Sequence, residues 1–190
     1  MFNECHQYRS LTTGVFPDSL KKARVTPIPK EGDKCNLSNY RPISVWPVFS
    51  KVFEKVAYSQ LSDYLENNSI LHKQQYGFRA KKSTTQAILH FLQYLYGHID
   101  SGNVVFSLFL DFRKAFDCVN HEILLSKLNT CGVRGVALDW SRSYITNRAQ
   151  YVSINNVDSN PRVIQCGVPQ GSILGPLLFL ILSEMISQML

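Results

Sequence analysis

The spacing of hydrophobic and polar positions changes several times along the 190 residues. Residues 23–45 contain two short extended stretches, each carrying proline, joined by a polar segment that includes Gly32 and Asp33. Because proline cannot donate to a strand ladder, this pattern predicts a hairpin of edge or loose strands. Residues 149–154 and 162–166 show strand-like composition around a polar tip containing Pro161, which predicts a second hairpin.

Other parts of the chain repeat with the period of a helix. From Val48 onward apolar residues fall on one helical face until Asn67 and Asn68 end the pattern. Ser83 is followed three residues later by Gln86, which predicts a capping box at the start of a second helix. Further helices are predicted around residues 123–128, around residues 136–144, and after the Gly/Pro-rich stretch that begins at residue 167.

The run "VVFSLFL" at residues 104–110 has no polar alternation and ends directly in Asp111. An unbroken apolar run of this length predicts a strand buried on both faces, at the centre of a sheet. Strands and helices therefore interleave along the chain, and no flexible linker divides it. The expected fold class is mixed α/β, with helices and strands in one domain.

Composition narrows the class of protein. Hydrophobic residues make up 45% and charged residues 18% of the chain, as in a globular protein. The net charge of +6 favours an anionic partner such as nucleic acid, although a mildly basic surface fits equally. The five cysteines include no C-x-x-C pair, so neither a disulfide framework nor a zinc knuckle is expected. Without a signal peptide or a membrane-spanning run, we expect an intracellular protein that does not enter a membrane.

Asp111 is the first candidate for chemistry. A carboxylate at the end of a central strand can point into a crevice and bind a hard cation such as magnesium, whereas an isolated aspartate can also simply start a turn or cap a helix. Asp117, six residues later, is interpreted as a structural residue that begins the next turn and helix. His121 is interpreted as a local cap contact at the start of that helix rather than a metal ligand.

Two other stretches are candidate binding sites. In "GVPQGS", residues 167–172, Gly167 and Gly171 allow close backbone approach to a flat ligand and Gln170 offers an amide, although glycine and proline also mark ordinary loops. Basic residues gather on the first hairpin and just before the helix start at Ser83, where cations and free N–H groups can meet phosphate. They are Lys30, Lys34, Arg41, Arg79, Lys81 and Lys82. For each of them a solvated surface charge is the alternative interpretation.

Four strings occur in a recognisable order. They are "NYRPISV", "QYGFRAKKST", "LDFRKAFD" with "VNHEILLSKL", and "GVPQGSILGPLLF", within a stretch from about Thr13 to Phe179. Together they resemble the reverse transcriptase domain of non-long-terminal-repeat retrotransposons of the long interspersed element type. The resemblance implies a right-hand polymerase fold with an antiparallel palm sheet. Residues 1–103 would form a fingers-like region, and residues 104–190 a partial palm with an interleaved fingers/palm segment.

The resemblance also assigns roles to individual residues. Asp111 would be a catalytic ligand of Mg²⁺, with Mn²⁺ as a possible substitute, and Phe116 would exclude a ribose 2′-hydroxyl from the incoming nucleotide. Gln170 and Gly171 would pack against that nucleotide and the template. Arg41 and Lys30 would hold the triphosphate. Arg79, Lys81 and Lys82 would lie along the nucleic acid.

The implied activity is RNA-templated DNA synthesis by two-metal phosphoryl transfer. An RNA template, a DNA primer and deoxynucleoside triphosphates would be the partners, in the nucleus or cytoplasm. The family's Tyr-x-Asp-Asp motif does not occur among the 190 residues, and the residues after Leu182 are "SEMISQML". We therefore expect a polymerase domain truncated before that motif and inactive by itself. A catalytically dead nucleic-acid-binding relic is the alternative, and a metal hydrolase based on Asp111 alone is a weaker third, because no His or Glu cluster supports it.

Overall fold

The computed structural model describes the backbone of residues 2–112 and 114–189 and the side chains of residues 8–112 and 114–184. The helices are α1 (Phe2–Thr13), α2 (Val48–Asn67), α3 (Thr84–Asp100), α4 (His121–Thr130), α5 (Val136–Ile145) and α6 (Gly175–Met189). The strands are β1 (Lys22–Pro29), β2 (Tyr40–Val45), β3 (Ala149–Ile154), β4 (Val157–Asp158) and β5 (Arg162–Val163). The expected mixed α/β class is confirmed.

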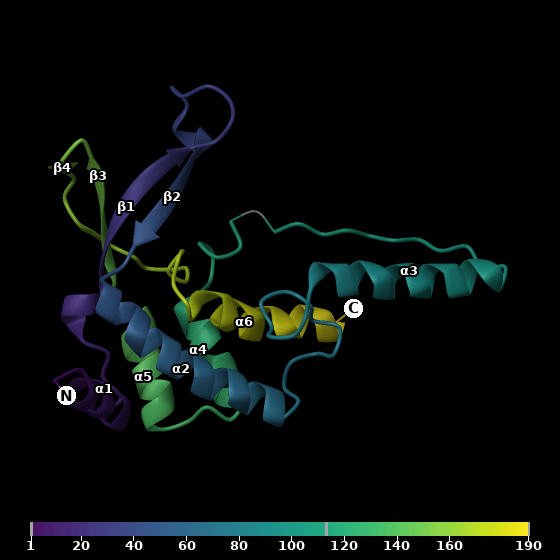
Figure 1. Cartoon of the computed structure of the whole chain (residues 1–190), viewed down its shortest axis with the longest axis horizontal. Helices are drawn as coiled ribbons and strands as arrows, with labels where there is room; N and C mark the ends of the chain where they lie inside the picture. The colour runs from purple at the N-terminus through teal and green to yellow at the C-terminus, as the bar shows by residue number, and fades with distance from the viewer. Residues whose placement is uncertain (1, 113, 190) are drawn as a thin grey trace.

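The sheet combines both predicted hairpins. Strand β1 pairs antiparallel with β2, from Arg24 opposite Val45 to Pro29 opposite Tyr40. On its other edge β1 pairs in parallel with β3, which in turn pairs antiparallel with β4 and β5. The sheet is therefore mixed, in the order β2-β1-β3-β4, and it rises above the helices in Figure 1. Asn155 and Asn156 both have positive φ, as a tight turn between β3 and β4 requires.

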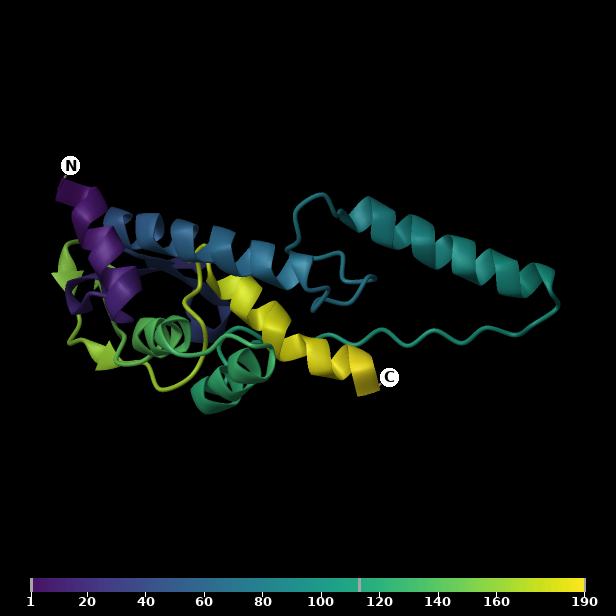
Figure 2. The same cartoon turned by 90° about the horizontal axis from the view of Figure 1, so that it is seen from below.

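The core lies between the helices rather than under the sheet. Helix α6 runs between α2 on one side and α4 and α5 on the other (Figures 1 and 2). Phe16, which is fully buried, packs edge-on against Phe53 of α2 and against Trp140 and Tyr144 of α5. Apolar side chains of all four helices and Phe16 thus form one cluster, which fixes α6 and the loop before it.

The ends of the helices follow local chemistry. Ser83 Oγ accepts a hydrogen bond from Gln86 N, and Gln86 Oε1 accepts one from Ser83 N, so the predicted capping box of α3 is confirmed. Helix α4 is capped by Asn120, whose Oδ1 accepts from the backbone N–H groups of Glu122 and Ile123. Among the helices in the described part of the chain, none combines the length and apolar character needed to cross a membrane.

The central strand expected at residues 104–110 is not present, and that prediction is wrong. The segment is extended but belongs to no strand, and its side chains face solvent: Phe106 is 93% exposed and Leu108 82% exposed. It runs back alongside α3, where the rings of Phe91 and Phe109 lie 5.8 Å apart, and both project from the rest of the molecule (Figures 1 and 2). A strand buried on both faces needs paired neighbours, and the described strands pair with each other instead.

Candidate functional site

The loop before α6 holds its backbone unusually close to other segments. Gly167 has a φ of 91° and Gly171 a φ of 80°. A Cβ atom on Gly167 would lie 2.9 Å from the carbonyl oxygen of Asp117, and one on Gly171 would lie 3.0 Å from that of Ser44. Both positions therefore require glycine, for conformation and for space. The close approach expected from the sequence occurs here against the chain's own backbone.

Hydrogen bonds join this loop to the turn that follows Asp111. Gly167 N donates to Val119 O at 2.7 Å, and Val168 N donates to Phe116 O at 2.8 Å. The buried ring of His121 donates from Nε2 to Gly167 O at 2.8 Å, because a carbonyl oxygen can only accept. His121 thus holds the loop, while Asn120 provides the helix cap that the sequence had assigned to His121. The two segments form a single hydrogen-bonded unit.

Gln170 and Asp117 meet within this unit. Gln170 Nε2 donates to Asp117 Oδ1 at 2.6 Å, and both side chains are half-buried. Together with Ser44 and Arg148 they line a cavity of about 210 Å³. The interpretation of Asp117 as a turn residue missed its contact with Gln170, and the sequence offers no spacing that would have revealed it, because 53 residues separate the two.

Asp111 lies apart from this cavity. It is exposed, follows the extended segment 104–110, and is absent from the cavity lining. Magnesium binds several oxygen ligands in octahedral geometry, so one carboxylate holds it poorly. In the part of the chain that the structure describes, no three His, Cys, Asp or Glu side chains gather closely enough to bind a metal ion. The described residues therefore do not form a metal site by themselves.

Phe116 lies where three of the sequence strings meet. Its half-buried ring packs edge-on against Phe78, with centroids 5.9 Å apart, and lies tilted against Phe179, with centroids 4.8 Å apart. Phe78 comes from "QYGFRAKKST" and Phe179 from "GVPQGSILGPLLF". The structure thus brings Phe116 and the loop 167–172 together, as expected, but does not bring Asp111 to Gln170.

The basic residues before α3 differ from one another in their contacts. Arg79 forms a two-pronged ion pair with Glu66 of α2, with Nε 2.8 Å from Oε1, and also donates to His72 O. These hydrogen bonds hold the pKa of Glu66 below its ordinary value. Lys82 lies over the ring of Tyr76, whereas Lys81 is exposed. Lys81 is therefore freer than Arg79 to meet a phosphate.

Lys30 and Arg41 lie on the β1–β2 hairpin, away from the cavity. Both are exposed, and neither is part of the cavity lining. Pro42 and Ser44 of β2 do line it. Because side chains alternate along a strand, Arg41 points to the opposite face of β2 from these two residues. The structure does not bring Lys30 or Arg41 together with Gln170.

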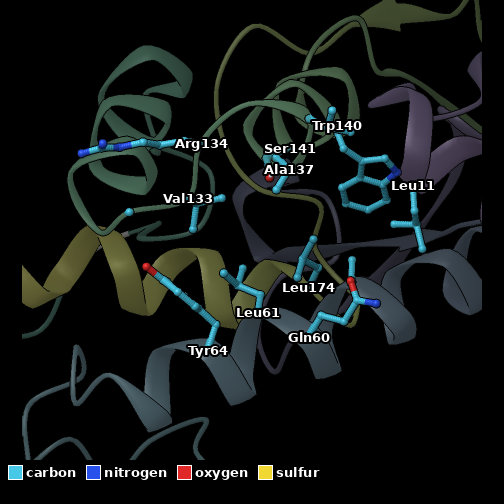
Figure 3. A pocket seen from close by; sticks show the side chains of 13 residues that line it. Leu11, Gln60, Leu61, Tyr64, Val133, Arg134, Ala137, Trp140, Ser141 and Leu174 are labelled. Atoms are coloured by element: carbon cyan, nitrogen blue, oxygen red, sulfur yellow. Dashed lines mark hydrogen bonds between the residues drawn. The ribbon is translucent and has the colours of Figure 1, made fainter.

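A larger cavity, of about 430 Å³, lies between α2 and α5. Gln60, Leu61 and Tyr64 project into it from α2, opposite Trp140 of α5, as Figure 3 shows. Its lining is mostly apolar and contains none of the residues singled out in the sequence. The candidate site therefore remains the unit formed by the loop 167–173 and the turn 116–121.

Comparison with known proteins matches residues 28–190 to the family model described as reverse transcriptase (RNA-dependent DNA polymerase). The chain is 34% identical to the probable RNA-directed DNA polymerase from transposon BS and 30% identical to the RNA-directed DNA polymerase from mobile element jockey, both of Drosophila melanogaster. Each alignment covers 89% of this chain, but 19% and 18% of the relative. A putative 115 kDa protein in the retrotransposable element R1DM of the same fly is 32% identical over 96% of this chain and 17% of the relative. The chain thus spans about a fifth of the length of these relatives.

Proposed function

Because this chain belongs to the reverse transcriptase (RNA-dependent DNA polymerase) family, we propose that it is part of an RNA-directed DNA polymerase of a non-long-terminal-repeat retrotransposon. The observation that carries the proposal is the family match over residues 28–190, which includes every string noted in the sequence. Its substrates are an RNA template, a DNA primer and deoxynucleoside triphosphates. It works inside the cell, in the nucleus or cytoplasm, where these substrates occur.

In this proposal residues 1–103 form the fingers-like region, and residues 104–190 a partial palm with an interleaved segment. Phe116 excludes the ribose 2′-hydroxyl, and Gln170 and Gly171 contact the incoming nucleotide and the template. The hydrogen bonds between the turn 116–119 and the loop 167–168 support the assignment of Phe116 and Gln170 to the same bound nucleotide. A nucleotide that contacts one of these segments lies within reach of the other. Lys30 and Arg41 hold the triphosphate, and Arg79, Lys81 and Lys82 contact the nucleic acid.

Reverse transcriptases use divalent metal ions, and we assign Mg²⁺, or Mn²⁺ in its place, to Asp111. Such ions activate the attacking hydroxyl and neutralise charge on the phosphates. The described residues fit this role incompletely: Asp111 is exposed and belongs to no group of three possible metal ligands among the described residues, and Asp117 is hydrogen-bonded to Gln170. We therefore derive no catalytic step through the ion from these residues.

Primer extension on an RNA template tests the activity. Without a Tyr-x-Asp-Asp motif, the polypeptide of these 190 residues is expected to bind a primer–template but not to extend the primer, and Asp111→Ala should not change that result. If the unmodified polypeptide extends the primer and Asp111→Ala abolishes extension, Asp111 has a carboxylate partner in this chain and the expected inactivity is wrong.

The second candidate function, a nucleic-acid-binding relic, is favoured by the exposed position of Asp111 outside any group of three metal-binding side chains among the described residues. A fusion separates the two candidates: the segment that follows the matched region in the transposon BS polymerase is joined after residue 190. Extension that depends on Asp111 would support a competent polymerase half. Primer–template binding without extension, in a fusion whose circular dichroism spectrum shows a folded protein, would support the relic. The transposon BS polymerase itself serves as the positive control.

A further inference from the structure

Arg148 is a buried cation just before strand β3. It is 1% exposed, and its guanidinium carbon lies 3.9 Å from the ring centre of Trp46 and 4.6 Å from that of Tyr144. Its Nη1 donates to Tyr144 O at 2.7 Å. Its Nε and Nη2 have no hydrogen-bond partner among the described atoms. Burying a charge costs free energy. Because no ion pair of Arg148 is found among the described residues, its contacts with the aromatic rings must stabilise the buried guanidinium.

Trp46 connects Arg148 to the candidate site. It is 3% exposed and lies between the end of β2 and the start of α2. One face of its ring carries the Arg148 guanidinium, and its indole Nε1–H donates to Gln170 O at 3.3 Å. A planar guanidinium stacked on an indole favours one orientation of that ring. Arg148 therefore directs the only hydrogen bond that Trp46 can donate from its side chain.

Glu54 of α2 holds the other end of the same loop segment. Its side chain is fully buried, and its Oε2 accepts from Ile173 N at 2.7 Å. Its Oε1 accepts from Ser50 Oγ at 2.9 Å. Burial lowers the pKa of Arg148. The Glu54 carboxylate partly opposes this shift, because its negative charge favours the charged guanidinium. The carbonyl of Gln170 and the amide of Ile173 are thus both held by buried side chains, those of Trp46 and Glu54.

We propose that Arg148 and Trp46 are positioning residues that set the orientation of Gln170 towards a bound nucleotide and template, with Glu54 anchoring the end of the loop. This inference rests on the proposed polymerase function for its last step. With the Gln170 carbonyl held by Trp46, the side-chain amide of Gln170 donates to Asp117 Oδ1 at 2.6 Å. When the stack is lost, the indole turns away and Gln170 loses its fixed direction.

The matched pair of variants is Trp46→Phe and Trp140→Phe. Each removes one indole N–H bond from a buried ring, to Gln170 O in the first case and to Ser10 Oγ in the second. Hydrogen exchange of peptides covering residues 167–175 is measured in both. We expect Trp46→Phe to speed exchange in this loop by about three- to tenfold, the ratio that corresponds to one hydrogen bond, and Trp140→Phe to leave it unchanged. Equal acceleration in both variants would overturn the positioning role.

Arg148→Lys tests the stacking step separately. It keeps the positive charge but lacks the flat guanidinium, so we expect the same faster exchange in the loop. Fluorescence of Trp46, recorded in a Trp140→Phe background, should shift towards longer wavelength as the indole becomes more exposed. If Arg148→Lys leaves both the fluorescence and the exchange unchanged, Arg148 does not position Trp46.

A double-mutant cycle connects the loop to binding. Primer–template affinity is measured by fluorescence anisotropy for Trp46→Phe, Gln170→Ala and the double variant. We expect Trp46→Phe to weaken binding severalfold, and to have no further effect once Gln170 is alanine. Additive losses would overturn the proposal that Trp46 acts through Gln170. If loop exchange rises in Trp46→Phe while Gln170→Ala binds as tightly as the unmodified chain, the positioning contact stands and the nucleotide-contacting role proposed for Gln170 is wrong.

Discussion

Gly167 is the tightest single position in the candidate site. Its φ of 91° lies in a region that other residues adopt only with strain, and a Cβ there would meet the backbone of both Asp117 and Phe116. Because those atoms belong to the backbone, no side-chain rotation can make room. The turn 116–119 would have to move away from the loop. Gly167 thus sets the distance between the two segments of the site.

We expect Gly167→Ala to lower the free energy of unfolding by about 1–3 kcal/mol or more, from backbone strain together with the steric clash. Urea denaturation measures the change. Gly97→Ala is the matched control, because Gly97 lies inside α3 and an added Cβ would meet no atom within 4 Å. That control should stabilise the helix by roughly 0.5–1 kcal/mol. A Gly167→Ala protein as stable as the original would contradict the tight approach.

The sequence pointed to some of the residues that lie together in this unit and missed others for a physical reason. Glycine and proline have backbone preferences that are typical of loops, so the sequence predicted a loop around Gln170. Trp46, Glu54 and Arg148 gave no signal, because each lies in a different segment and their contacts depend on how distant elements pack. Periodicity indicates which face of an element is buried. It does not indicate which distant residue a buried polar side chain contacts.

Among the elements, the segment 104–110 has the most unusual surroundings. Its apolar side chains are exposed, and among the described residues no backbone group is recorded as its strand partner. Uncharged stretches rich in β-branched and aromatic residues, with free backbone groups, pair readily with copies of themselves. The buried central strand predicted for this run is wrong because an apolar pattern does not specify which strand lies beside it.

We expect Phe106→Lys to reduce self-association of the polypeptide, since it puts a charge in the middle of the exposed run. Light scattering at increasing protein concentration measures the effect. Val157→Lys is the control: Val157 is also an exposed apolar residue but lies on β4, and its substitution adds the same charge. If both variants reduce scattering equally, net charge rather than the segment 104–110 governs association.

The ion pair of Glu66 and Arg79 links the end of α2 to the segment before α3. A carboxyl group whose pKa is lowered by folding stabilises the fold above its ordinary pKa of 4.5, and that contribution is lost as the pH falls through the lowered value. Glu66→Gln should therefore reduce stability at pH 7, by less than about 1 kcal/mol because water screens the pair. The difference from the original chain should disappear in acid.

Urea denaturation at pH 7 and near pH 3 measures this change. Glu122→Gln is the matched control, since Glu122 pairs with Arg142 at 3.4 Å between two well-exposed side chains. It should change stability by no more than a few tenths of a kcal/mol at pH 7, because both side chains are exposed, apart from the small contribution of a charge in the first turn of α4. A loss for Glu66→Gln that is equally large in acid would mean that the glutamine disturbs packing rather than removing a charge.

At the scale of the whole molecule, the net charge of +6 favours binding to a polyanion. We expect affinity for an RNA–DNA hybrid to be independent of sequence and to fall steeply as salt increases, because each phosphate contact releases about one counterion. Lys81→Ala with Lys82→Ala should lower the slope of log affinity against log salt by about two. Anisotropy titrations over a range of salt concentrations measure it.

The control for that experiment is Lys51→Ala with Lys55→Ala, two exposed lysines of α2 that belong to neither basic cluster. Since both double variants change the net charge by the same amount, a general effect of charge would lower both slopes equally. That result would contradict a nucleic-acid contact at Lys81 and Lys82. An affinity that does not depend on salt would contradict the electrostatic basis of binding altogether.

The class of the whole molecule could be predicted from its sequence more fully than the arrangement of its parts. Helix α2 and the capping box of α3 follow from local spacing and were predicted close to their observed limits. The parallel pairing of β1 with β3 could not be predicted, because strand partners are chosen by packing over long separations. Helix α1 was also missed, since its sequence has little amphipathic pattern.

The pairing of β1 with β3 also has a consequence for the order in which the chain folds. Lys22 lies opposite Ala149 and Val25 opposite Val152, so this ladder cannot close until residue 152 has left the ribosome. The β1–β2 hairpin forms from residues that are close in the sequence. The other edge of β1 then stays unpaired while the ribosome adds more than a hundred residues. Contacts between such distant residues slow folding, and a hairpin waiting in this way is exposed to wrong partners. During synthesis, the edge of β1 that later pairs with β3 is therefore exposed between the completion of β2 and the emergence of β3.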